Sequence, residues 1–341
     1  MSGFIYNWEI AGHQKVLKEI EKDLLSGNVS HAYLFAGPPH VGKMTLARKL
    51  AKILQCEEQG NDADGFLLRG CGKCQICSNI AKGYHPDTIE LLDDSENLKI
   101  DPMREILARL STTANGNYKI LLVQNIERMT PETANILLKT LEEPPSQVIF
   151  LFTTSNLEDV LLTVLSRVRL LKLSSLSPAD LMGFLQKKFP AVDQEKIQEI
   201  MDLSFGMPGR AVHFCEDEEY FEEVKGLLEK VLKVLQHGDI VEKFTLINEA
   251  TQAPKTDSDK KFEHEFFDVF LLALRYTMLE ELRNYESEMK HGAERREVEM
   301  KSSRQKLLRT LDALRRSQDA VRLQKRNVNA RLLFENIILN T

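Results

Sequence analysis

The sequence predicts an α/β domain with a mostly parallel sheet, followed by regions that contain only helices. Short apolar runs alternate with helical stretches over the first half of the chain. A glycine-rich loop follows the first of these runs, and beyond residue 173 the apolar residues follow helical periods. Apolar strands that alternate with helices are typical of a parallel sheet buried on both faces.

Five apolar runs are expected to form the strands of this sheet. They lie at residues 32–35, 88–92, 120–123, 148–152 and 169–173. The glycine-rich loop, residues 37–44, comes directly after the first run and opens a helix expected over residues 44–50. A phosphate-binding loop requires this order, because the N–H groups at the start of the helix bind the phosphate oxygens.

The loop carries most, but not all, of the residues that bind a nucleotide with Mg²⁺. Gly37 and Gly42 let backbone N–H groups approach phosphate oxygens, and Lys43 is placed to reach the β- and γ-phosphates. The next position, where such loops carry a Ser or Thr that ligates Mg²⁺, is Met44. We therefore interpret the loop as a degenerate site that binds ATP or ADP weakly or not at all.

The second contact to the metal is also missing. In these proteins an acid at the end of a later strand holds Mg²⁺, but the run at residues 120–123 continues into Gln124 and Asn125. Both Mg²⁺ ligands and the acid that would activate water are thus absent together. We expect an NTPase fold kept for a purpose other than hydrolysis, and a chain that is not an enzyme by itself.

Composition and charge narrow the class of protein. A chain of 341 residues accommodates two or three domains, and 43% apolar residues is ordinary for a globular protein. The net charge of -6 argues against general coating of nucleic acid. No apolar run approaches the roughly 18–20 residues of a membrane span, and the N-terminal residues lack the pattern of a signal peptide. We expect a cytoplasmic protein without a membrane partner.

Four of the five cysteines lie close together and predict one structural zinc ion. They are Cys56, Cys71, Cys74 and Cys77. The tight spacing lets neighbouring thiolates converge on a tetrahedral Zn²⁺, whereas disulfides do not persist in a reducing cytosol. Reduced thiols, or a redox pair at Cys74 and Cys77, are the alternatives. His85 is expected to be a loop residue, and Cys215 an ordinary core or linker residue.

The composition changes after Leu173 and indicates two further domains. Ser177 suits the N-cap of a helix and Pro178 its first position. The helical unit that begins there is broken at residues 206–209, and the acidic residues 216–219 lead into a third, all-helical region. The predicted domains are residues 1–173 (with the zinc module at about 56–85), 174–214 and 215–341.

Near the C-terminus, residues 295–331 are rich in Lys and Arg. Interleaved charges of this kind form a solvated helix face or a stripe that meets phosphate or a partner.

Several segments, taken in order, resemble bacterial clamp-loader subunits of the AAA+ superfamily. They are residues 30–37, 71–77, 98–105, 135–145 and 165–167, and residues 206–211 and 327–336 are similar to the delta-prime type of subunit in DNA polymerase III. The resemblance extends from about residue 7 to the end of the chain and is weakest over residues 215–320.

This resemblance implies an AAA+ α/β domain, a helical lid and a helical collar that joins five subunits into a heteropentamer. Such a complex opens a sliding clamp and places it on primed DNA. The delta-prime type is implied to act as a stator that contacts the delta subunit and an ATP-hydrolysing gamma/tau subunit. Two alternatives are a zinc-dependent nucleic-acid-binding regulator, which the acidic balance opposes, and an ATP-hydrolysing motor subunit of the same complex, which Lys43 favours.

The resemblance also implies a role for Arg167. In the family a Ser-Arg-Cys motif lends an arginine finger to the neighbour's ATP site, and the matching residues here are Ser166, Arg167 and Val168. The alternative is that Arg167 makes only a surface salt bridge next to the following strand. Active subunits carry a lid Arg where this chain has Gly209, and Arg210 is displaced by one residue, about 100° around a helix. The lid is therefore expected not to complete a catalytic site.

Overall fold

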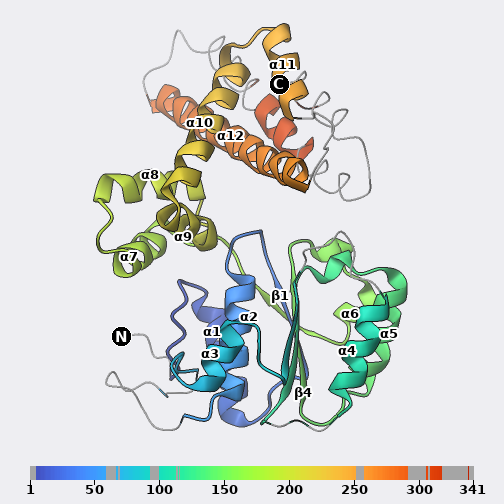
Figure 1. The fold of residues 1–341 in the computed structure, drawn as a ribbon. Helices are drawn as coiled ribbons and strands as arrows, with labels where there is room; N and C mark the ends of the chain where they lie inside the picture. Colours follow the sequence, from blue (N-terminus) through green and yellow to red (C-terminus); the bar gives the residue numbers. More distant parts are fainter. Residues whose placement is uncertain are drawn as a thin grey trace. The chain divides into compact units, whose positions relative to one another are not determined.

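The structure is a computed structural model that describes residues 5–58, 67, 70–92, 100–112, 114, 116–250, 257–290, 305, 308–316 and 337. The chain divides into two compact units, residues 1–215 and 216–341 (Figure 1). The first unit holds a sheet with its covering helices and a group of three more helices. Every secondary-structure element that the structure describes in the second unit is a helix.

The first unit is built on a five-stranded parallel sheet in the order β2-β3-β4-β1-β5. The strands are β1 (Ala32–Ala36), β2 (Thr88–Leu91), β3 (Lys119–Val123), β4 (Val148–Thr154) and β5 (Arg169–Lys172). All five predicted strands are thus present. Because β1 pairs with β4 on one side and β5 on the other, the loop that follows β1 leaves the sheet between these two strands.

Helices cover both faces of this sheet (Figure 1). On one face lie α1 (Gln14–Ser26), α2 (Lys43–Gln55) and α3 (Gln75–Ala81), and on the other lie α4 (Ile100–Leu110), α5 (Pro131–Glu142) and α6 (Leu162–Leu165). Each face has its own cluster of buried apolar side chains. Along β1, Tyr33 and Phe35 join one cluster while Leu34 joins the other, since successive side chains of a strand point to opposite faces.

Three helices complete the first unit. They are α7 (Pro178–Lys188), α8 (Gln194–Ser204) and α9 (Pro208–Glu216), and two short 3-10 helices, η1 (Ile126–Arg128) and η2 (Leu157–Asp159), connect parts of the sheet domain. The start of α7 is as predicted, because the backbone N–H of Asp180 donates to Ser177 Oγ at 3.1 Å and Pro178 is the first helical residue. Between α8 and α9 the backbone turns through Phe205 and Gly206, both in the left-handed region.

The second unit contains α10 (Glu218–His237), α11 (Ile240–Ala250) and α12 (Asp257–Lys290), and residues 308–316 are also helical. Asp217 caps α10 by accepting a hydrogen bond from the N–H of Tyr220 at 2.9 Å. Helices α10 and α12 pack against each other. Among the described residues no strand follows β5, and no helix is long and apolar enough to cross a membrane.

Three sequence segments fall wholly or partly outside the described residues. Outside the described residues lie most of the basic stretch 295–331, all of residues 327–336, and residues 98 and 99. Within the basic stretch, Arg316 forms an ion pair with Asp312 at 2.7 Å, one helical turn away.

Candidate functional site

The phosphate-binding loop joins β1 to α2, and the ammonium group of Lys43 is bound within it. Lys43 Nζ donates to the carbonyl oxygens of Gly37 and Pro38, each at 2.8 Å, and to Ser155 Oγ at 3.1 Å. The Lys43 residue is only 8% exposed. An ammonium has three N–H donors, so these three acceptors use all of them. Lys43 can bind a phosphate only by giving up some of these hydrogen bonds.

Asn125 lies beside this loop, at the end of β3. Its backbone N–H donates to Thr153 Oγ1 at 3.1 Å, and its side-chain Oδ1 lies 3.5 Å from Ser155 Oγ. The amide carries no charge with which to hold Mg²⁺, which prefers carboxylate and phosphate oxygens. A carboxylate does lie nearby, on Glu127, whose Oε1 accepts a hydrogen bond from the N–H of Ser155 at 2.9 Å.

Ser155 and Glu127 were missed by the sequence reasoning. Ser155 lies just after β4, 112 residues from Lys43, and no motif connects the two positions. The adjacent carboxyl ends of β3 and β4, which are paired in the sheet, bring these polar residues to the loop.

Helix α9 contacts the phosphate-binding loop through Gly209. The Gly209 N–H donates to the carbonyl oxygen of His40 at 2.8 Å. A Cβ added at Gly209 would lie 2.8 Å from the same oxygen, closer than real Cβ contacts. The position where a lid Arg is expected is therefore occupied by a backbone contact that leaves no room for a side chain.

A second contact holds the other side of the loop. His13 Nε2 lies 3.2 Å from the carbonyl oxygen of Val41. Burial lowers the pKa of His13, and the hydrogen bond to Val41 opposes that change in part. The neutral imidazole that burial favours can still donate one N–H to this carbonyl. Between the N-terminal segment, the loop and helices α7 and α9 lies a hollow of about 170 Å³ lined mainly by apolar residues. It is smaller than typical ligand pockets of roughly 300–1,000 Å³.

The four predicted zinc ligands come together in space. All four Sγ atoms, of Cys56, Cys71, Cys74 and Cys77, lie within 4.8 Å of one another. Cys56 follows the end of α2, and Cys74 is the N-cap of α3. With Zn–S bonds of about 2.3 Å, the sulfur atoms of a tetrahedral site lie about 3.8 Å apart. The Cys56–Cys74 separation of 4.0 Å is close to that value, so the four residues fit a zinc ion.

Backbone N–H groups point at the sulfur atoms, as they do at thiolates. Cys71 Sγ accepts from Cys74 N at 3.3 Å and from Lys73 N at 3.4 Å, and Cys74 Sγ accepts from Cys77 N at 3.4 Å. Burial by itself raises the pKa of Cys71, but these N–H donors lower that pKa below its usual value. Burial raises the pKa of Cys77. His85 is outside the cluster and contacts Thr88 Oγ1 at 3.3 Å, in a loop as expected.

Arg167 lies after α6 with its guanidinium held by three acceptors. Nη1 donates to the carbonyl oxygen of Thr163 at 2.8 Å and to Ser166 Oγ at 2.9 Å, and Nη2 donates to Glu142 Oε1 at 2.6 Å. The side chain of Arg167 is 33% exposed and that of Glu142 is 52% exposed. The surface salt bridge weighed as an alternative role for Arg167 is thus present. Val168 packs into the core, so the motif keeps its apolar third side chain.

The surface around Arg167 is hollow and partly apolar. An open hollow of about 670 Å³ is lined by Ser30, His31, Glu142 and Arg169 in addition to Arg167. Leu162, at the start of α6, is 82% exposed, and Leu161 before it is 41% exposed. Arg167 thus follows a four-residue helix whose first turn presents two leucines to solvent.

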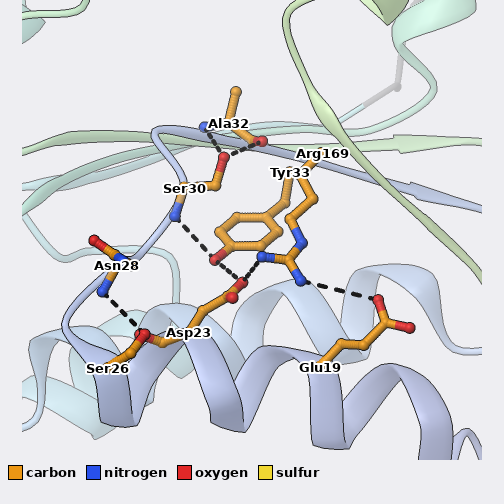
Figure 2. Close-up of polar contacts among 8 residues, drawn as sticks. All are labelled: Glu19, Asp23, Ser26, Asn28, Ser30, Ala32, Tyr33 and Arg169. Atoms are coloured by element: carbon orange, nitrogen blue, oxygen red, sulfur yellow. Dashed lines mark hydrogen bonds and ion pairs between the residues drawn. The ribbon is translucent and has the colours of Figure 1, made fainter.

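A buried polar cluster fixes the start of β5, two residues beyond Arg167 (Figure 2). Asp23 Oδ2 accepts hydrogen bonds from Tyr33 Oη, at 2.8 Å, and from Arg169 Nη1. Burial raises the pKa of Tyr33, which keeps its hydroxyl a donor. The N–H of Ser30 donates to the same hydroxyl at 3.0 Å, and Glu19 lies 4.0 Å from Arg169. This cluster ties β5 to β1 and α1. The signal for it in the sequence is a carboxylate at an apolar position of α1.

The α/β part of the chain matches a known protein family. Residues 12–177 match the family model described as "DNA polymerase III, delta subunit". The DNA polymerase III subunit gamma of Buchnera aphidicola subsp. Schizaphis graminum is 32% identical over 248 residues, which are 70% of this chain and 66% of that protein. The DNA polymerase III subunit tau of Escherichia coli K12 is 36% identical over 160 residues, 47% of this chain and 24% of that protein.

The chain therefore spans 66% of the length of the Buchnera gamma subunit and 24% of the length of the Escherichia coli tau subunit. Among solved structures, a gamma-subunit-related protein of Thermotoga maritima is similar at 18% identity and a TM-score of 0.44, over 94% of this chain and 97% of that one. The names of these relatives are gamma and tau, and they do not single out the delta-prime type.

Proposed function

Because residues 12–177 are related to the DNA polymerase III clamp-loader subunits of the AAA+ superfamily, we propose that this chain is a clamp-loader subunit that does not hydrolyse ATP itself. In this proposal it joins a heteropentamer that loads the sliding clamp onto primed DNA. Its type is delta-prime, with a gamma/tau subunit on one side and a delta subunit on the other.

The observation that carries this proposal is the state of the phosphate-binding loop. Met44 and Gln124 replace the two Mg²⁺ ligands, and Asn125 replaces the acid that would activate water. Gly209 meets the loop through its backbone, where a lid Arg would need space. Mg²⁺ that bridges the β- and γ-phosphates supplies several kcal/mol of transition-state stabilisation. Each ~1.4 kcal/mol is a factor of ten in rate, so loss of both ligands lowers turnover by roughly three orders of magnitude or more.

Arg167 is the residue that we propose acts in the complex, as an arginine finger for the neighbouring gamma/tau subunit. Such a residue must reach the surface and keep donors for a phosphate. Arg167 is one third exposed, and the exposed Leu161 and Leu162 beside it suit a surface that a second subunit covers. We assign Ser166 to holding the guanidinium, since its Oγ accepts from Nη1.

A second candidate is an ATP-hydrolysing motor subunit of the same complex. The names of the relatives, gamma and tau, and the presence of Lys43 favour it. It requires Mg²⁺ to bind without a ligand at Met44 or at Gln124. Glu127, a carboxylate near the loop, is occupied by a hydrogen bond from the backbone N–H of Ser155.

The test is the steady-state ATPase rate of the purified chain, with and without Mg²⁺, next to the Lys43→Ala variant. We expect both proteins to show only background turnover, and a gamma/tau subunit measured beside them to show Mg²⁺-dependent turnover. If the pure chain hydrolyses ATP with Mg²⁺ and Lys43→Ala abolishes the activity, the chain is a motor subunit.

A further inference from the structure

Arg167 has more donors than its three acceptors use. A guanidinium carries five N–H donors in a planar fork. Thr163 and Ser166 use both N–H bonds of Nη1, and Glu142 uses one N–H of Nη2. Within the described residues, the Nε–H and the second Nη2–H of Arg167 have no acceptor. These two remaining donors can hydrogen-bond to phosphate oxygens, a charge-assisted contact stronger than a neutral one.

The acceptors come from two different elements, and this fixes the direction of the fork. Thr163 and Ser166 belong to α6 and its end, whereas Glu142 is the last residue of α5. A guanidinium held only at Nη1 could still swing about that end. The bond from Nη2 to Glu142 Oε1, at 2.6 Å, removes this freedom. The C-terminal end of the 12-residue helix α5 adds a partial negative charge that favours a cation at this place.

We propose that Glu142 is a positioning residue for Arg167: it holds the guanidinium so that the two remaining N–H donors face the γ-phosphate of the nucleotide bound by the neighbouring subunit. This inference rests on the proposed function of Arg167. A finger that is already oriented loses less conformational freedom when the phosphate arrives. The substrate that this arrangement recognises is a nucleoside triphosphate held by another chain.

The ion pair between Arg167 and Glu142 contributes little to the stability of the fold. Both side chains are partly exposed, at 33% and 52%, and exposed ion pairs contribute little to folding. Substitution of Glu142 should therefore leave the chain folded, and an effect on turnover can be separated from unfolding. Glu143, the next residue, is also exposed and is a matched control, since no hydrogen bond or ion pair joins it to Arg167.

The experiment is a double-substitution cycle in the reconstituted complex, with DNA-stimulated ATP turnover as the readout. We expect Glu142→Ala to lower kcat about 3- to 10-fold with the KM for ATP unchanged, because the contact acts in the transition state. Glu142→Gln, which keeps an oxygen acceptor, should retain part of the rate, and Glu143→Gln should match the wild type. In complexes that already carry Arg167→Ala, Glu142→Ala should have no further effect, as expected of two residues that act as a unit.

Three results would overturn the inference. One is a normal or raised kcat for Glu142→Ala while Arg167→Ala lowers it; the chain would then supply a finger that needs no positioning by Glu142. Another is an equal loss from Glu142→Ala in the presence and absence of Arg167. The third is normal turnover for Arg167→Ala itself, which overturns the proposed function of Arg167 and this inference together.

Discussion

Gly209 determines how closely α9 approaches the phosphate-binding loop. Its N–H donates to the His40 carbonyl, and the Cα of this glycine faces that carbonyl without a side chain between them. His40 itself has φ of 59°, in the left-handed region that disfavours residues other than glycine by roughly 1–2 kcal/mol. The contact from α9 therefore helps to hold the loop in a conformation that its own sequence does not favour.

We expect Gly209→Ala to separate α9 from the loop. The added methyl group would overlap the His40 carbonyl, and overpacking of this kind costs about 1–3 kcal/mol of unfolding free energy. Urea unfolding measures that loss, and hydrogen exchange of the α9 amides locates it. Gly183→Ala in α7 is the control, because a Cβ there meets nothing within 4 Å, and it should stabilise its helix by up to ~1 kcal/mol. Equal behaviour of the two variants would show that the contact is not tight.

At the scale of single residues, the role of a position can be predicted from the sequence where a motif requires a particular side chain, such as a metal ligand. Met44 and Gln124 could be recognised because a metal ligand is needed at their positions. The contact of Lys43 with Ser155 could not, since it depends on how two strands are ordered in the sheet. Glu142 was also not foreseen as the partner of Arg167, 25 residues away, although the surface salt bridge was weighed.

Among the helices, α3 is the one whose stability we expect to depend on a bound metal. It has seven residues, of which only Cys77 and Ile80 are buried. Isolated helices this short are not stable in water. A metal that joins Cys56 at the end of α2 to Cys74 and Cys77 in α3 would fix the helix in place, because the energy of metal binding at such sites is folding energy.

We expect one zinc per purified chain, and Cys74→Ser to lower the zinc content and loosen α3. Elemental analysis measures the metal, and hydrogen exchange over residues 71–81 measures the loosening. Zinc should also be released as the pH falls, since protons compete for the thiolates. Cys215→Ser, outside the cluster, is the control and should keep the metal. Zinc-free wild-type protein, or an unchanged content in Cys74→Ser, would contradict the assignment.

The strands were predictable and the ends of the helices were less so. A sheet covered by helices on both faces requires continuous apolar runs, and such runs are plain in the sequence. Helix α2, by contrast, continues to Gln55, five residues beyond the expected end at residue 50. Ala51, Ile53 and Leu54 extend its buried face in the helical period, and this continuation was overlooked. The pairing of α10 with α12 has no signature in the sequence.

For the whole molecule, the decisive variant is Arg167→Ala in a reconstituted complex. An arginine finger is worth on the order of 10³–10⁵ in rate at its own site. The loss for the complex should be smaller, because on the proposed function this chain would serve only one of several ATP sites. We expect normal assembly with lower DNA-stimulated ATP turnover and slower clamp loading. Arg167→Lys should restore little, because an ammonium cannot reproduce the planar fork.

Arg104→Ala is the matched control, since Arg104 lies on α4 with 63% of its side chain exposed and makes only a surface ion pair with Asp101. It should leave turnover and loading unchanged. If the Arg167→Ala complex also loads clamps at the normal rate, Arg167 has only the surface role that its ion pair with Glu142 gives it.

The backbone contact between Gly209 and His40 makes a return to ATP hydrolysis harder. On the proposed function, a return to ATP hydrolysis would need a hydroxyl at Met44, acids at Gln124 and Asn125, and, as the last of these changes, an arginine at Gly209. That arginine is the third kind of substitution. The third substitution cannot enter until α9 has moved away from His40, and that move loses packing. On the proposed function, a chain whose α9 already packs against its own phosphate-binding loop would depend on the nucleotide sites of its neighbours.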